Sequence, residues 1–460
     1  MSRLIVISNR VTVADSRPAS SGGLAVGVLA ALRETGGIWV GFSGETSETP
    51  SDHAKRFTAG HIGYATIDVT PGDYQGYYNG FANSVLWPLF HYRLGLINFT
   101  RAALGAYQRV NARFADLTVP LLRADDTIWV QDYHLIPLGE ELRQRGVTQS
   151  IGFFLHTPFP ARQVFSSLPQ HRVIGETLAA YDVVGFQTQS DRNNFVDYAV
   201  NTLGASRIAE GRLRLNGRVF SAEAFPIGVD ADIIAEFAKR SAESPSVIRL
   251  RDSLQGRDLM IGVDRLDYSK GLIERFGAFE RLLTRFPERR KRVTYMQIAP
   301  PTRADVAEYS EIRAKLEASA GHINGGFAEY DWMPLRYLNR SFTRQTLAGF
   351  FRFSRVGLVT PLRDGMNLVA KEYIAAQDPA DPGVLVLSAF AGAAEQLDSA
   401  LIVNPYDVDE LAEAMDRALD MPLDERQDRW RKAMDSVTRE DINHWRNNLL
   451  ATLRGAHIRA

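Results

Sequence analysis

The segment VTPLRDGMNLVAKEY, at residues 359–373, joins an apolar strand to the start of a helix through a charged turn. Asp364 and Gly365 turn the chain, and residues 368–372 have the composition of the first turns of a helix. The helix start would offer backbone N–H groups to a diphosphate, while Asp364 and Glu372 would accept hydrogen bonds from sugar and ribose hydroxyls. An Asp-Gly turn without a ligand is the competing interpretation, because such turns are common. The combination favours a site for a phosphate and a sugar.

Short apolar runs that lead into helical patterns recur on both sides of this segment. Such runs alternating with amphipathic helices predict parallel sheets covered on both faces. In the helix expected at residues 190–204, Ser190 should cap the N-terminus and Gly204 should end the helix. Asn-Gly within residues 211–221 predicts a hairpin. We expect strands at residues 4–8, 127–131, 151–156, 182–188, 259–264, 293–299, 356–361, 383–388 and 400–405, and helices around 135–145 and at 190–204, 272–286 and 407–421.

The simplest architecture is an α/β fold of two doubly wound domains that face each other across a cleft. A polar, helix-like stretch at residues 232–255 separates the two series of strands. We therefore expect an N-terminal domain at 1–235, a C-terminal domain at 236–440 and a terminal segment at 441–460. In such sheets ligands bind beyond the carboxyl ends of the strands, and the candidate residues below are sought there.

Composition narrows the class of protein. The 460 residues are 45% apolar and 23% charged, with a net charge of −1, so there is no global electrostatic case for binding nucleic acid or an anionic membrane. Cysteine is absent, which excludes disulfides, thiolate metal sites and cysteine nucleophiles. The apolar run in MSRLIVISNR is too short for a signal peptide, and no run approaches the length of a membrane helix. We expect a cytoplasmic protein.

Candidate residues of the first half follow its strands. Arg10 comes just after the first strand, and the pair Gly22-Gly23 precedes a helical pattern, where backbone N–H groups could approach an anion. A plain turn is the commoner meaning of a double glycine, and the spacing is not that of the dinucleotide fingerprint. Tyr78 and Trp87 lie in an aromatic-rich stretch, where core packing and a sugar site are equally good interpretations.

Two further residues follow buried strands of the first half. Asp132 comes directly after residues 127–131 and could contact ligand hydroxyls or only cap the next helix. His156 ends the run at 151–156, ahead of a proline-rich loop. A lone histidine is usually structural, but its place at a carboxyl edge raises the chance of function.

The second half supplies positive charge at strand ends. Arg265 and Lys270 lie where a strand passes into a helix and could converge on a diphosphate; pairing with nearby aspartates is the alternative. Arg303 follows another strand and a Pro-Pro pair, and it could hold a second phosphate.

In this order, the segments SNR, SGGLAVG, YYNGFANSVLWPLFHY, WVQDYHL, GFFLHTPFP, DRLDYSKGL, QIAPPTR and TPLRDGMNLVAKEY resemble the retaining glycosyltransferase family 20. The resemblance runs from residue 3 to about 447 and is closest to bacterial single-domain members, which make trehalose 6-phosphate. It implies a GT-B fold of two Rossmann-like domains, with the helix at 442–455 crossing back onto the first. It also implies a nucleotide-glucose donor, usually UDP-glucose, and glucose 6-phosphate as acceptor.

The resemblance also assigns roles to residues. The implied acceptor-binding residues are Arg10, Tyr78, Trp87, Asp132 and Arg303. The implied donor-binding residues are Gly22, Gly23, Arg265, Lys270, Phe342, Asp364, Leu368, Val369, Ala370, Lys371 and Glu372. The implied catalytic residues are Asp132, His156, Arg265, Lys270 and Asp364.

A front-face mechanism is implied, in which the leaving diphosphate oxygen takes the proton of the acceptor hydroxyl and no metal or other cofactor is required. Family membership further suggests a homo-oligomer, dimer or tetramer, that serves trehalose biosynthesis and osmoprotection. The alternatives are a related transferase with another acceptor such as glycerol phosphate, a non-catalytic nucleotide-sugar sensor, and a pyridoxal-phosphate phosphorylase of similar fold. The nucleobase of the donor stays open.

Overall fold

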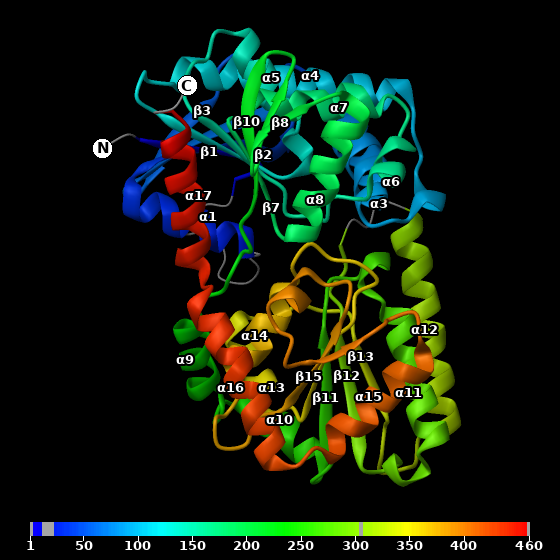
Figure 1. The fold of residues 1–460 in the computed structure, drawn as a ribbon. Coiled ribbons are helices and arrows are strands. Elements are labelled where there is room, and N and C mark those ends of the chain that lie inside the picture. The colour runs from blue at the N-terminus through cyan, green and yellow to red at the C-terminus, as the bar shows by residue number, and fades with distance from the viewer. Residues whose placement is uncertain (1–2, 12–22, 303–306, 458–460) are drawn as a thin grey trace. The chain divides into compact units, whose positions relative to one another are not determined.

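The computed structural model describes residues 3–11, 23–302 and 307–457, which form two compact α/β units (Figure 1). The first unit holds the chain up to Pro226 and again from Trp445, and the second holds Ile227–His444. Each unit is a largely or wholly parallel sheet with helices on both faces, which confirms the predicted fold class. Among the described residues, no helix is both long and apolar enough to cross a membrane.

The sheet of the first unit has the strand order β3-β4-β2-β1-β5-β6-β7-β10-β9-β8. The pairs β3–β4, β8–β9 and β9–β10 are antiparallel and the others are parallel. The order reverses between β1 and β5, so a ligand site is expected beyond the carboxyl ends of these strands. The strands are β1 (Leu4–Arg10), β2 (Gly37–Thr46), β3 (Lys55–Ala59), β4 (Ile62–Val69), β5 (Thr127–Gln131), β6 (Ile151–Phe154), β7 (Val183–Phe186), β8 (Ser206–Ala209), β9 (Arg212–Leu215) and β10 (Arg218–Ala224).

Helices cover both faces of this sheet. They are α1 (Gly23–Thr35), α2 (Pro71–Tyr74), the π-helix η1 (Gln75–Leu86), α3 (Trp87–Phe90), α4 (Arg101–Thr118), α5 (Leu138–Gln144), α6 (Arg162–Ser166), α7 (His171–Thr177), α8 (Gln189–Tyr198) and the π-helical turn η6 (Ala199–Leu203). Short 3-10 turns are η2 (Leu94–Leu96), η3 (Val119–Leu121), η4 (Tyr133–Leu135) and η5 (Leu178–Ala180).

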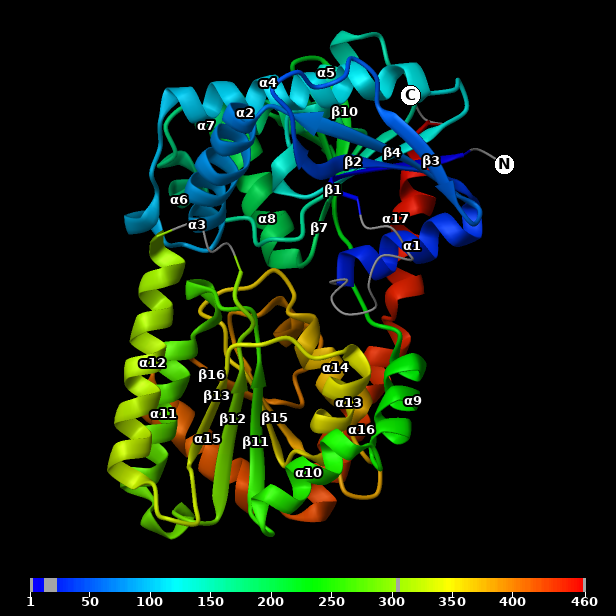
Figure 2. The same cartoon turned by 180° about the vertical axis from the view of Figure 1, so that it is seen from behind.

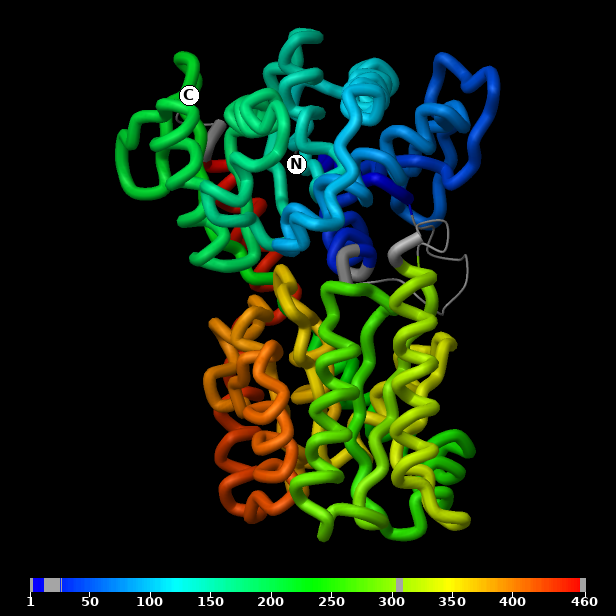
Figure 3. The backbone as a smooth tube through the Cα atoms, turned by 90° about the vertical axis from the view of Figure 1, so that its right-hand side faces the viewer, coloured from blue at the N-terminus to red at the C-terminus, as the bar shows by residue number. Residues whose placement is uncertain are grey.

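The C-terminal helix α17 (Ile442–His457) returns the chain to the first unit, as predicted (Figure 3). Trp445 is 1% exposed and packs against Trp129 of β5 and Phe154 of β6. Arg446 pairs with Glu34 of α1, which lies beside α17 (Figure 2). Two distant segments of the chain therefore cover the same sheet.

The second unit has an entirely parallel sheet of order β13-β12-β11-β14-β15-β16. Its order reverses between β11 and β14, so these two strands mark its expected ligand edge. The strands are β11 (Asp258–Val263), β12 (Val293–Ile298), β13 (Leu335–Leu338), β14 (Val356–Val359), β15 (Val384–Ser388) and β16 (Leu401–Val403).

Two helix layers enclose this sheet. One contains α11 (Leu272–Arg285), α12 (Ala307–Phe327) and α15 (Val408–Asp420); the other contains α9 (Ala231–Ser241), α10 (Pro245–Leu254), α13 (Arg344–Phe353), α14 (Leu368–Ala376) and α16 (Leu423–Arg439). The 3-10 turns are η7 (Tyr268–Lys270), η8 (Pro287–Arg289) and η9 (Gly392–Glu395). The core is apolar side chains of the sheet and of the inner helix faces, such as Phe276 and Phe279 of α11.

One local prediction is wrong and others are confirmed. Ser190 does not cap its helix, because the hydroxyl of Thr188 accepts the hydrogen bond from the backbone N–H of Asp191 and Ser190 already lies inside α8. Gly204 does end the helical segment in a left-handed conformation. The predicted hairpin is β9–β10, with Asn216 and its glycine neighbour both at positive φ.

Candidate functional site

Asp132 lies at the reversal of strand order in the first unit, directly after β5. Its backbone has φ 72° and ψ 166°, a combination that glycine adopts and other residues avoid. This conformation costs about 1–3 kcal/mol and persists only where the surroundings impose it. The N–H of Asp132 donates to the Phe154 carbonyl at 2.8 Å, and a carboxylate oxygen accepts from the N–H of His156 at 3.2 Å. The strained backbone conformation places an acidic side chain at the carboxyl edge of the sheet.

His156 follows β6, and its backbone N–H donates to the Asp132 carboxylate, so these two strand-end residues lie together. Its Nε2 lies 3.0 Å from the amide oxygen of Gln131, and its Nδ1 lies 3.5 Å from the amide nitrogen of Gln187. These partners fit a neutral ring with its proton on Nε2, because a carbonyl oxygen can only accept. Burial lowers the pKa of His156 to about 3. The side chain is therefore a neutral hydrogen-bonding group at pH 7.

Tyr78 is presented by the π-helix η1, a conformation that is rare and is concentrated at functional sites. Its ring lies between Tyr74, with centroids 5.2 Å apart, and His134, at 5.7 Å, and both contacts are stacked. The side chain is half-buried. The preceding residue, Tyr77, donates from its hydroxyl to Asn9 at the end of β1 at 2.8 Å. The π-helix is thus tied to the carboxyl edge of the sheet.

Trp87 begins α3 and is 6% exposed. Its ring packs on His91, with centroids 4.1 Å apart, and on Tyr133, at 5.8 Å. Much of the Trp87 ring therefore serves as core packing. The role of Trp87 in a sugar site stays a prediction.

Arg10 ends β1 and its side chain is exposed. The guanidinium lies over Gly44 of β2: a Cβ added there would lie 2.5 Å from a terminal nitrogen of Arg10. Gly44 also has φ +96°, which a larger residue rarely adopts. The backbone of β2 therefore leaves the space that Arg10 occupies. A cation is held at the same edge as Asp132.

Lys270 and Asp364 are paired in the second unit. The Lys270 ammonium lies 2.5 Å from the Asp364 carboxylate, and the Asn367 amide donates to the same oxygen at 3.1 Å. Lys270 is 8% exposed. The two residues come from the ends of β11 and β14, so the structure brings them together at the predicted edge.

The loop that carries Arg265 and Lys270 is held by a buried aspartate. Asp267 is 0% exposed and accepts hydrogen bonds from the backbone and hydroxyl of Ser269, at 2.9 and 2.8 Å, and from the Tyr309 hydroxyl at 2.9 Å. Arg265 is exposed. Lys270 is therefore held in an ion pair, whereas the Arg265 side chain is exposed on the same loop.

Helix α14 begins at Leu368, as predicted, after Asn367 in a left-handed conformation. Lys371 is 1% exposed, and its ammonium donates to the Ile227 carbonyl at 2.8 Å. Burial lowers the pKa of Lys371 to about 7, although Glu440 opposes that shift. The Lys371 side chain is thus committed to a contact within the unit.

Glu372 lies in α14 and Phe342 lies just before α13, and these two helices pack against each other. A terminal nitrogen of Arg344 lies 3.4 Å from the Glu372 carboxylate. Burial raises the pKa of Glu372 and Arg344 counteracts the rise. Phe342 packs edge-on against Phe350, and Arg340 lies 4.6 Å from the Phe342 ring centroid. A carboxylate and an aromatic face are available on the helix layer of α13 and α14.

Two predicted residues, Gly22 and Arg303, lie outside the described residues. Gly23 is the first residue of α1, so a helix begins at the second glycine of the predicted pair. Among the described residues, no group of three or more histidine, aspartate or glutamate side chains could hold a metal ion.

The model of glycosyltransferase family 20 matches residues 3–455. The chain belongs to glycosyltransferase family 20. It is 50% identical over 454 residues to the trehalose-6-phosphate synthase of Klebsiella pneumoniae subsp. pneumoniae, which covers 99% of this chain and 95% of that relative.

Solved structures of the family superpose closely on the chain. A UDP-forming alpha,alpha-trehalose-phosphate synthase from Burkholderia xenovorans in complex with glucose-6-phosphate is 51% identical, with a TM-score of 0.95, over 98% of this chain and 100% of that one. The Escherichia coli protein bound with UDP-2-fluoro glucose is 49% identical, with a TM-score of 0.93, over 98% of this chain and 99% of that one. The GT-B fold implied by the sequence is confirmed.

Some residues of this family 20 site are not evident from motif reading. Arg275 is a buried cation on α11, and Asn9 and His134 support Tyr77 and Tyr78. The available signal for Arg275 is its position: it lies three residues after Leu272 and four before Phe279, on the apolar face of the helix. A charge at such a position indicates a buried polar partner.

Proposed function

We propose that this chain is a UDP-forming alpha,alpha-trehalose-6-phosphate synthase, which transfers glucose from UDP-glucose to D-glucose 6-phosphate with retention of configuration. The observation that carries the proposal is the partly buried Lys270–Asp364 pair at the switch of the second sheet, in a chain about half identical to trehalose-6-phosphate synthases over nearly its whole length. A cation beside a carboxylate suits a diphosphate next to a sugar.

The second unit would bind the donor. Arg265 and Lys270 would neutralise the diphosphate, and Asp364 would accept hydrogen bonds from the hydroxyls of the donor glucose. The backbone N–H groups at the start of α14 would approach the diphosphate, while Glu372 would accept from the ribose diol and Phe342 would lie near the base. Support comes from the arrangement of these residues along β11, β14 and α14. Within residues 368–372, the side chain of Lys371 would not take part.

The first unit would bind the acceptor, with help from Arg303 of the second. Arg10 and Arg303 would hold the 6-phosphate, because guanidinium groups match its oxygens in geometry and charge. Tyr78 and Trp87 would pack against the sugar ring, and Asp132 would accept a hydrogen bond from the reacting hydroxyl. His156, as a neutral group, would contact the donor glucose, and the Gly22-Gly23 loop would cover the donor.

The chemical step would be front-face transfer. The bond from the anomeric carbon to the diphosphate oxygen breaks, the acceptor oxygen attacks from the same face, and its proton passes to the leaving oxygen. The protein's part is positioning and charge stabilisation, and Lys270 and Arg265 would contribute most as negative charge grows on the leaving group. These two cations would do the work that a divalent metal does elsewhere, so we propose a reaction that requires none.

The biological setting follows the family. We propose a cytoplasmic enzyme of trehalose biosynthesis, with a role in osmoprotection, that forms a dimer or tetramer of identical chains. Light scattering of the purified protein tests the oligomeric state, and a mass of one chain would remove that part of the proposal.

The function is tested with purified protein and separate donors and acceptors. UDP-, GDP- and ADP-glucose are each incubated with glucose 6-phosphate, glycerol 3-phosphate or no acceptor, and released nucleoside diphosphate is measured. We expect rapid release of UDP only with UDP-glucose and glucose 6-phosphate together. Release of nucleoside diphosphate with glycerol 3-phosphate instead would refute glucose 6-phosphate as the acceptor. Rapid release with GDP-glucose and with neither other donor would refute UDP-glucose as the donor.

A further inference from the structure

A single buried guanidinium links the ligand edges of β11, β12 and β14. Arg275, on α11, is 0% exposed. Its Nε donates to the Thr360 hydroxyl at 2.9 Å, and one terminal nitrogen donates to Asp264 and to Gln297, each at 2.8 Å. The other terminal nitrogen donates to the Lys270 carbonyl at 3.2 Å. One planar group therefore fixes several loops relative to one another.

Each partner of Arg275 lies next to a residue of the proposed donor site. Asp264 precedes Arg265, and the Lys270 carbonyl belongs to the residue that pairs with Asp364. Thr360 is 0% exposed and begins the turn that leads from β14 to Asp364. A displacement of the guanidinium would therefore move both halves of the Lys270–Asp364 pair.

The surroundings of Arg275 are shaped for the guanidinium. A Cβ added to Gly262 of β11 would lie 2.7 Å from a terminal nitrogen of Arg275 and 2.4 Å from the side-chain oxygen of Gln297. The absence of a side chain at Gly262 is what allows this close approach. The Tyr295 hydroxyl also donates to the same Gln297 oxygen, so the acceptor is held from a second direction.

Stability alone is a weak reason for this arrangement. Removing a guanidinium and a carboxylate from water costs several kcal/mol per ion, and apolar residues of similar volume often make a core as stable or more so. Burial raises the pKa of Asp264 and the positive charges of Arg275 and Lys270 oppose the rise. The geometry is what an apolar replacement would lose, because only a planar fork reaches all of these acceptors.

We propose that Arg275 is a positioning residue for glucosyl transfer, which aligns Lys270 and Asp364 with the donor without touching it. The inference rests on the proposed function, since it assigns the donor to this edge. A misplacement of about 1 Å in reacting groups can cost about 100-fold in rate. Arg275→Lys keeps the charge opposite Asp264 but cannot hold the whole set of acceptors.

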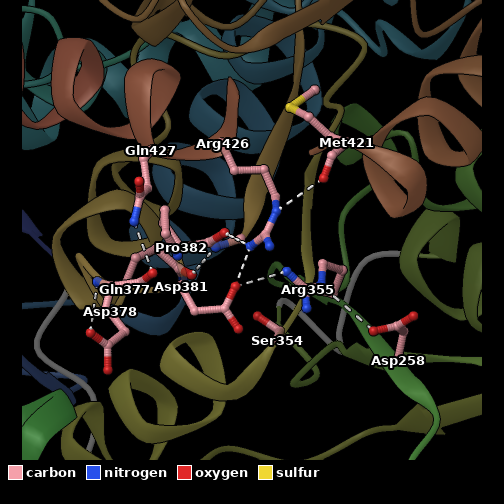
Figure 4. Close-up of polar contacts among 12 residues, drawn as sticks. Asp258, Ser354, Arg355, Gln377, Asp378, Asp381, Pro382, Met421, Arg426 and Gln427 are labelled. Carbon is pink, nitrogen blue, oxygen red and sulfur yellow. Dashed lines mark hydrogen bonds and ion pairs between the residues drawn. The ribbon is translucent and has the colours of Figure 1, made fainter. Parts of the chain in front are cut away.

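Arg426 provides a matched control in the same unit. It is 7% exposed, and it donates to the Met421 carbonyl at 3.1 Å and to Asp381 and the Pro382 carbonyl at 2.5 Å (Figure 4). Asp381 and Pro382 directly precede β15, so they lie at its amino end, away from the proposed donor site. Arg426→Lys thus removes a buried fork of similar type where no substrate is expected.

The test compares the wild type, Arg275→Lys, Arg426→Lys and the milder Thr360→Val, which removes one acceptor and keeps the ion pair. For each, kcat and both KM values, the melting temperature and peptide hydrogen exchange are measured. We expect Arg275→Lys to lower kcat by at least about tenfold and Thr360→Val by a smaller factor, with an unchanged KM for glucose 6-phosphate. Arg426→Lys should lower the melting temperature but keep kcat within about twofold.

Equal kcat losses in Arg275→Lys and Arg426→Lys, or wild-type kcat in both Arg275→Lys and Thr360→Val, would overturn the positioning role. Hydrogen exchange does not depend on turnover: residues 264–271 and 360–367 should exchange faster in Arg275→Lys and not in Arg426→Lys. If the wild type makes no product from these substrates, the proposed function fails, while faster exchange in both segments still supports the alignment by Arg275. Unchanged exchange there would refute it.

Discussion

Replacing Asp132 by glycine and by alanine separates the strain at this residue from its chemistry. Both variants lose the carboxylate and its hydrogen bond from the N–H of His156, so both should lose nearly all transfer activity. Alanine retains the backbone conformation of φ 72° and ψ 166°, whereas glycine adopts it freely. Because the lost contacts are common to the pair, the difference in stability reports the backbone alone.

The expected difference follows from two opposing contributions. Relief of strain favours the glycine variant by about 1–3 kcal/mol, and the greater freedom of glycine in the unfolded chain opposes it by about 0.5–1 kcal/mol. The mid-points of the two ranges, about 2 and about 0.75 kcal/mol, leave a net expectation of about 1 kcal/mol in favour of glycine. In a domain of this size, 1 kcal/mol shifts the melting temperature by roughly 2–4 °C.

Differential scanning calorimetry of the two variants measures this difference. We expect Asp132→Gly to melt at least about 2 °C above Asp132→Ala. The strained conformation would be refuted by an alanine variant as stable as the glycine variant, or more so. Transfer activity in either variant close to that of the wild type would refute the assignment of the carboxylate to the site.

Three further predictions concern charge and pH. Lys270→Ala, or Arg265→Ala, should lower kcat by about 100-fold or more with the fold retained, because each removes a cation from the leaving group; near-normal turnover in both variants would refute the diphosphate assignment. Arg303→Ala should raise the KM for glucose 6-phosphate far more than that for the donor, and equal effects on the two in steady-state kinetics would argue against an acceptor-phosphate role. The pKa of His156 is about 3 in the folded chain and 6.5 in the unfolded chain, so the unfolded chain binds the extra proton and the free energy of unfolding falls as pH drops from about 6.5 towards 3. In thermal melts between pH 6.5 and 4, His156→Gln should therefore lose less stability than the wild type. An equal dependence of melting temperature on pH in the two proteins would contradict a neutral His156 ring in the folded chain.

The parallel sheets were predictable because their strands are continuous apolar runs that end at polar residues. Residues 127–131 and 259–264 are such runs, and the structure places strands over them. Strands β2, β3 and β4 were not predicted. Glycine and polar residues interrupt the apolar residues of β2 and β4, and the residues of β3 are mostly exposed and carry no apolar run. Strand β13 has only one buried residue, so it gives a similarly weak pattern.

The candidate site was predictable where one residue type at a strand end already implies the chemistry. The pairing of Lys270 with Asp364 needs the strand order of the sheet, because 94 residues separate them along the chain. The positive φ of Asp132 and the π-helix that carries Tyr78 leave no signature in residue type. Arg275 is the case in which more could have been predicted, since a charge on an apolar helix face implies a buried partner.

The identity and the linkage of the reaction product test the proposed glucosyl transfer most directly. UDP-glucose labelled with ¹³C at C1 of its glucose is incubated with unlabelled glucose 6-phosphate and the purified protein, and the product is followed by NMR. The account predicts a non-reducing disaccharide with one labelled and one unlabelled anomeric carbon, both in the α configuration, and a phosphate on the unlabelled sugar. A β linkage at the labelled carbon, or a label that appears only as free glucose, would contradict it.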